Sequence, residues 1–138
     1  MVLRAITSDS PGTGVRAEMA ANDLLLVTED AVVVRTDAAT ANDAAISALE
    51  GGNMLDIRGG VASGGTGILL GNSQSDDWDY SVKLGANAFV NSFWGSGIRA
   101  SAINVHIVNA GAIQGHDGIE LNGISSSDVY RSRVVNSG

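Results

Sequence analysis

A two-part unit recurs along the chain and limits its fold more than any other feature of the sequence. Each unit opens with a short strand-like segment that leads into a turn of small residues, and the openings start at Val27, Ile57, Leu84, Val108 and Val135. Successive openings are 24–30 residues apart. Repeats of this length are typical of solenoids, in which each repeat is one layer of a stack and insertions lie at the corners.

A second apolar segment follows each of the first four openings, and its isoleucine falls at Ile46, Ile68, Ile98 and Ile119. Apolar and polar residues alternate in this segment: Ile119 and Leu121 share one face, and Glu120 takes the other. Such alternation is typical of a strand with one buried face. We therefore expect two interior columns, one made by the five opening residues and one by the four isoleucines.

The fold class predicted by this pattern is all-β, a parallel β-helix (β-solenoid) of about four coils. The composition agrees, because 18 glycines, a single proline and 44% hydrophobic residues suit many short strands joined by tight turns. Residues 1–23 do not match the unit and are expected to form an N-terminal cap, with residues 15–23 as a short helix or an irregular turn. Residues 24–138 are expected to form the coils, the last one incomplete.

Charge and cysteine content exclude several classes of partner. The net charge is −7 and the eight basic residues are scattered, so no basic stripe is available for nucleic acid. No apolar run is long enough to cross a membrane, and the N-terminus lacks the apolar core of a conventional signal peptide. The expected partners are further coils of the same protein or neighbouring copies, which would pair with the open edge of the last coil.

One cluster of residues resembles an active site: His106, His116, Asp117 and Glu120. The alternation places Glu120 on the outer face beside Arg99 of the preceding coil, where a solvated ion pair is the simplest interpretation. His116 then fills a turn, and no catalytic residue is predicted. The alternative is a carbohydrate-active enzyme of the polysaccharide lyase or epimerase type, with an outer groove lined by Asp117, Glu120, Arg99, Arg131 and His116. About four coils are few for such a cleft.

The aromatic residues form a second group, and exposed aromatic rings stack on sugars or anchor partners. Trp78, Tyr80 and Trp94 are therefore candidate ligand-binding residues, together with His116, Asp117 and Glu120, and polysaccharide is a candidate partner. Phe89 is expected inside the solenoid because it occupies the position of Ile113. Two asparagines, Asn109 and Asn136, share one column and could pair their amides along the stack.

The stretches VNAGAIQGHDGIELNG at residues 108–123 and VVNSG at residues 134–138 resemble the β-solenoid repeats of secreted bacterial proteins. Such repeats occur in autotransporter-type adhesins and in calcium-binding proteins of the repeats-in-toxin class. The resemblance implies the fold and leaves calcium possible in the wider family. Tandem GGxGxD repeats are absent here, and Thr66 and Ser96 stand where Asp117 would need partners. No cofactor or metal is therefore expected in this segment, and Asp117 is the residue that would contribute to a calcium site.

These observations favour a non-enzymatic segment of a larger bacterial surface or matrix protein, acting as scaffold, spacer or adhesive. The expected location is secreted or extracellular, without a conventional signal peptide. The carbohydrate-active enzyme and a self-stacking filament subunit are the alternative functions.

Overall fold

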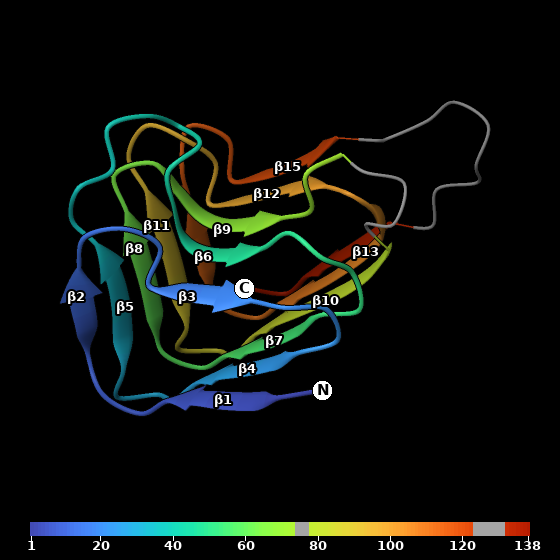
Figure 1. Ribbon diagram of the computed structural model, residues 1–138, viewed down its shortest axis with the longest axis horizontal. Coiled ribbons are helices and arrows are strands. Elements are labelled where there is room, and N and C mark those ends of the chain that lie inside the picture. Colours follow the sequence, from blue (N-terminus) through green and yellow to red (C-terminus); the bar gives the residue numbers. More distant parts are fainter. Residues whose placement is uncertain (74–77, 123–131) are drawn as a thin grey trace.

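The chain forms three parallel β-sheets that enclose one apolar interior, as the computed structural model shows for residues 1–73, 78–122 and 132–138 (Figure 1). The first sheet contains β1 (Leu3–Ile6), β4 (Leu24–Val27), β7 (Met54–Ile57), β10 (Trp78–Leu84), β13 (Ile103–Asn109) and β16 (Arg133–Asn136). The second contains β2 (Ser10–Gly12), β5 (Val32–Arg35), β8 (Gly60–Ser63), β11 (Phe89–Ser92) and β14 (Ala112–Gln114). The third contains β3 (Ala17–Met19), β6 (Ala44–Ala48), β9 (Thr66–Leu70), β12 (Ile98–Ser101) and β15 (Ile119–Asn122).

The chain visits the three sheets in a fixed order, one strand in each, and then begins the next coil directly on the last. The four coils expected from the repeat are β4–β6, β7–β9, β10–β12 and β13–β15. Every strand pairs in parallel with the corresponding strand of the neighbouring coil, so the predicted all-β parallel β-solenoid is confirmed. Among the described residues, no helix has the length and apolar character needed to span a membrane.

The N-terminal segment differs from the prediction, because residues 1–23 form a coil of their own instead of a cap. Their strands β1, β2 and β3 pair with β4, β5 and β6, one in each sheet. The segment expected as a helix or irregular turn contains β3, in which Ala17 and Met19 are buried and Glu18 is exposed. Two inward side chains suffice for a strand of this stack, so the segment is too short to show the repeat pattern in its sequence.

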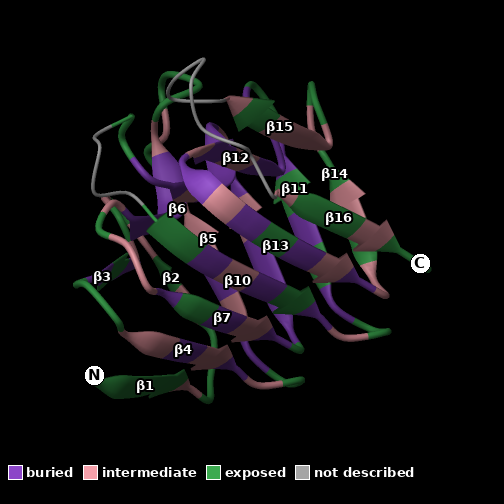
Figure 2. Cartoon of the chain, turned by 90° about the vertical axis from the view of Figure 1, so that its right-hand side faces the viewer, coloured by how far each residue is buried: buried purple, intermediate pink, exposed green. Residues whose placement is uncertain are grey.

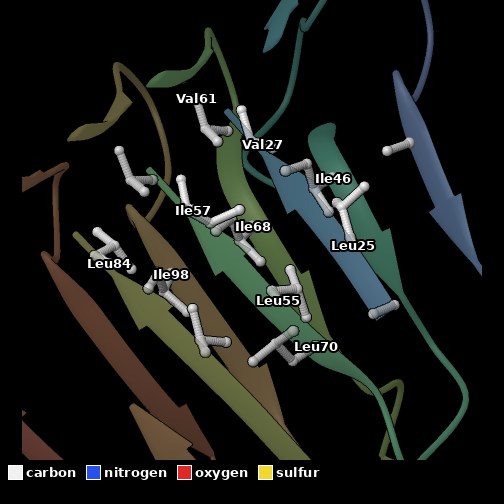
Figure 3. Close-up of a cluster of buried hydrophobic side chains, with 14 of the residues drawn as sticks. Leu25, Val27, Ile46, Leu55, Ile57, Val61, Ile68, Leu70, Leu84 and Ile98 are labelled. Atoms are coloured by element: carbon white, nitrogen blue, oxygen red, sulfur yellow. The ribbon is translucent and has the colours of Figure 1, made fainter. Parts of the chain in front are cut away.

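Aliphatic side chains from all three sheets meet in the interior (Figure 3). The predicted column of the third sheet is confirmed, since Ile46 pairs with Ile68, Ile68 with Ile98, and Ile98 with Ile119. The first three are fully buried, and Ile119, in the last strand of the sheet, is partly buried. Figure 2 shows the matching alternation of buried and exposed residues along the strands of the first sheet.

The interior column of the first sheet departs from the prediction after Leu84, where the pairing is shifted by one residue. Val27, Ile57 and Leu84 stack as expected, but Leu84 pairs with Asn109 and not with Val108. Because a shift of one residue exchanges the two faces of a strand, Val108 and Val135 leave the interior column. The predicted amide pairing is confirmed: Asn109 Nδ2 donates to Asn136 Oδ1 at 2.8 Å. Asn109 is buried, so this hydrogen bond satisfies a polar group inside the stack.

Phe89 is also placed differently, because it pairs with Ala112 while Val90 pairs with Ile113. Val90 is therefore the buried residue, and Phe89 points outward with 38% of its surface exposed. Its ring lies over Gly60 of the preceding coil, at the position that a side chain on Gly60 would occupy. The missing side chain at residue 60 lets an outward aromatic ring pack on the sheet.

The buried isoleucine column gives the first prediction. Replacing Ile98 with Asp places a carboxylate between Ile68 and Ile119, and we expect a loss of several kcal/mol in the free energy of unfolding, because an unpaired charge is buried there. Asn91→Asp adds the same charge at an exposed position of β11 in the same coil and should change stability by less than about 0.5 kcal/mol. Chemical denaturation of both variants makes the comparison. Equal midpoints would contradict the register.

Candidate functional site

The corner between the second and third sheets carries the groups that could bind a ligand. Four successive connections stack there: residues 36–43, 64–65, 93–97 and 115–118, at the upper left of Figure 1. Their backbones are hydrogen-bonded across coils, with Trp94 N donating to Gly64 O at 2.8 Å and His116 N donating to Gly95 O at 2.9 Å. The corner is thus an extension of the sheet ladder, and its side chains have defined positions.

The longest of these connections, residues 36–43, is held by one arginine and two carboxylates. Arg35 lies 2.9 Å from Asp37 and 3.2 Å from Asp43, measured between guanidinium nitrogens and carboxylate oxygens. Asp43 also accepts hydrogen bonds from the backbone N–H groups of Thr40 and Ala39, and these bonds are the main reason why its pKa is lowered. Ion pairs and hydrogen bonds of its own residues, together with Arg35, therefore hold the loop in place.

This loop packs closely over two glycines of the next coil. A side chain on Gly65 would overlap the carbonyl oxygens of Thr40 and Asp43. Thr66 Oγ1 then donates to Ala41 O at 2.5 Å. The paired glycines at 64–65 thus allow a loop from one coil to reach the side chains of later coils.

A small recess of about 140 Å³ opens beside this loop and is the candidate site. It is lined by residues of four coils: Ala41, Thr66, Trp94, Gly95, Ser96, Arg99, His116, Asp117 and Glu120. Four of the six predicted site residues, Trp94, His116, Asp117 and Glu120, are therefore brought together. We call this feature the Trp94 recess.

Glu120 is the central anion of the Trp94 recess. Its two carboxylate oxygens accept hydrogen bonds from Ser96 Oγ at 2.7 Å and from Asn122 Nδ2 at 2.9 Å. Arg99 Nε lies 3.5 Å from the same carboxylate, and Arg99 Nη1 donates to Asn42 Oδ1 at 2.7 Å. Hydrogen bonds from Asn122 and Ser96, aided by the charge of Arg99, lower the pKa of Glu120 against the opposing effect of burial.

Arg99 and Glu120 pair on adjacent rungs with about a third of each side chain exposed. The predicted outward orientation of both residues is therefore confirmed. The ion pair is part of a network that the prediction did not contain, because Asn42 is 57 residues away from Arg99 in the sequence.

His116 and Asp117 lie at the outer rim of the recess. Their side chains are mostly exposed, and His116 Nδ1 is 3.5 Å from Asp117 Oδ2. No three His, Cys, Asp or Glu side chains of the described ranges converge in a way that could hold a metal ion. His106 does not join the cluster, because it is exposed on β13 of the first sheet. Arg131 lies outside the described residues.

The aromatic candidates separate into three environments. Trp94 is 61% exposed and its ring packs edge to face with Phe93, with 4.6 Å between the ring centroids. Trp78 is partly exposed at another corner, where it lines a wider hollow of about 650 Å³ with Glu50 and Asp79. Tyr80 is buried, so the prediction of an exposed Tyr80 platform is wrong.

Tyr80 is buried because it alternates in phase with Val82 and Leu84 on the inward face of β10. The backbone beside Tyr80 is irregular, because Asp79 has a φ of 61° and Asn104 in the next coil has a φ of 57°. The pairing passes from Trp78–Ile103 to Tyr80–Val105, so the two left-handed residues stack on each other, and Asn104 Nδ2 donates to Asp79 Oδ1 at 3.0 Å. Trp78, two residues before Tyr80 on the other side of this irregularity, is exposed.

Comparison with known protein families, with curated proteins and with solved structures found no match for this chain. A proposal for its function therefore rests on the fold and on the geometry of the Trp94 recess.

The network around Glu120 gives the second prediction. Because the pKa of Glu120 is lowered from its ordinary value of 4.5, its carboxylate stabilises the fold above that pH, and the contribution disappears as the pH falls through the lowered value. Glu120→Gln should cost less than about 1 kcal/mol at neutral pH. The difference from the parent should shrink in acid.

Thermal unfolding between neutral and acidic pH measures this effect. Glu18→Gln, at an exposed position of the same sheet, is the control and should show a smaller difference at neutral pH. A penalty for Glu120→Gln that stays constant into acid would contradict the network.

Proposed function

We propose that this chain is a non-enzymatic β-solenoid segment that holds a binding surface in a fixed position, as the scaffold or adhesive part of a larger bacterial surface or matrix protein. Support comes from the regular stack, in which each coil adds one strand to each sheet and pairs in register with its neighbours. In such a fold, side chains on one outer corner keep constant spacing from coil to coil. A surface built this way suits adhesion or spacing.

One observation carries the non-enzymatic part of the proposal: each carboxylate oxygen of Glu120 already accepts a hydrogen bond, from Ser96 or Asn122, and Arg99 lies beside the carboxylate. A general acid at neutral pH needs a raised pKa, whereas the contacts of Glu120 lower it. A carboxylate that accepts hydrogen bonds from its own scaffold is also a poor general base. Asp117, the other carboxylate of the recess, lies at the exposed rim.

Location and partners extend the proposal on the basis of the sequence. The resemblance of residues 108–123 to repeats of secreted bacterial proteins supports an extracellular place. The net charge of −7 and the lack of cysteine are compatible with it. Further coils and polysaccharide are the proposed partners, and calcium is not assigned to this segment.

The third prediction tests the absence of catalysis against the alternative of a polysaccharide lyase or epimerase, and hydrolysis is measured beside these two reactions. We expect polygalacturonate, alginate and neutral glucans to stay intact after incubation with the chain, at the level seen with the heat-unfolded chain. Absorbance of unsaturated uronates, the number of reducing ends and the ¹H NMR spectrum of the polymer report the three reactions. Product that disappears in Glu120→Gln and persists in Glu18→Gln would show that the chain is an enzyme.

A further inference from the structure

We propose that the Trp94 recess binds one ring of a neutral saccharide chain, with Trp94 as the stacking platform. This inference rests on the proposed function and names the ligand class of the adhesive surface. The first observation is the exposure of two aromatic side chains, 71% for Phe93 and 61% for Trp94, whereas the inward side chains of the same coil are buried. Large apolar rings left in water at adjacent positions mark a binding surface more often than isolated ones do.

The platform is held in place before any ligand arrives. The backbone of Phe93 and Trp94 is hydrogen-bonded to Ser63 and Gly64 of the preceding coil. The two rings stand at 89° to each other, an edge-to-face contact that restricts their rotation. A ring fixed in this way loses little conformational entropy on binding, which favours stacking on the apolar face of a sugar.

Polar groups beside the platform match the hydroxyl groups of a sugar. The recess is lined by the guanidinium of Arg99, the carboxylates of Asp117 and Glu120, and the imidazole of His116. Carboxylates accept hydrogen bonds and a guanidinium donates them, so both kinds of partner for a hydroxyl group are present. Arg99 and Glu120 are also oriented by Asn42 and Ser96, as an ordered binding site requires.

Charge selects a neutral saccharide over an acidic one. The recess contains one arginine against two carboxylates, and the whole chain carries a net charge of −7. Uronate or sulfated chains would meet like charge at this corner and over the rest of the surface. Neutral hexoses avoid this repulsion and keep the hydrogen bonds.

The size of the recess limits the contact to a single ring. Its volume of about 140 Å³ is below the roughly 300–1,000 Å³ of pockets that enclose a drug-sized ligand. Neighbouring sugars of the chain would therefore lie outside the recess, toward the exposed Phe93. Such a contact is weak by itself and is strengthened when several copies are presented together.

The fourth prediction uses the two tryptophans of the chain. In Trp78→Phe, Trp94 is the only remaining tryptophan, so its fluorescence reports on the recess alone. We expect a saturable change with cellohexaose or maltohexaose and none with hexagalacturonate at the same concentration. Absence of a saturable change with both neutral hexaoses, or a preference for the anionic one, would overturn the proposal.

Saturation-transfer NMR of the bound neutral hexaose provides a second readout that needs no tryptophan. Trp94→Ala should weaken binding about tenfold or more, and Trp78→Ala, at the other corner, should leave it unchanged. Both variants should melt close to the parent, because both rings are partly exposed. Glu120→Gln should also weaken binding. Equal binding by Trp94→Ala and the parent would place the saccharide elsewhere.

The two proposals can fail separately in these experiments. Binding at Trp94 followed by cleavage of the saccharide would reject the non-enzymatic function and keep the site. An intact polymer without binding to the Trp94 recess would reject the saccharide site and leave the scaffold function in place.

Discussion

Hydrogen bonding between equivalent strands of neighbouring coils is the interaction on which the rest of this structure depends. A single coil of three short strands cannot bury its apolar face or satisfy its backbone, and both needs are met only by the coil above and below it. The register of this pairing decides which side chains enter the core. It places Ile46, Ile68 and Ile98 in one fully buried column. The same register also decides which side chains face outward.

The same pairing gives the outer corner its order. Loops of different length can be added there without disturbing the core, because the strands on either side remain in register. The loop at residues 36–43 uses this freedom: it is anchored by Arg35 and packs over Gly65 toward later coils. Asn42 thereby reaches Arg99, and four coils contribute to one recess. The saccharide proposal follows from this convergence of an exposed aromatic pair and a fixed polar network.

The sequence alone carried enough information for the fold class and for the third sheet. The spacing of Ile46, Ile68, Ile98 and Ile119, each in an alternating segment, predicted the column that the pairing confirms. It also predicted that Arg99 and Glu120 face outward, because alternation fixes both faces of a strand once one is assigned. Asn109 and Asn136 were recognisable as partners because they recur at one position of the unit.

Tertiary structure decided the features that depend on pairing between distant residues. Val108 and Leu84 look equivalent in sequence, yet the coil below aligns Leu84 with Asn109, and Phe89 turns outward over Gly60 for the same reason. Residues 1–23 join the stack because their short strands pair with the strands of the next coil, which cover their inward side chains. The left-handed residues Asp79 and Asn104 meet in adjacent coils and are joined by a hydrogen bond, a match that neither segment reveals by itself. Local alternation identifies the two faces of a strand, but only contact with the neighbouring coil determines which residue lies above which.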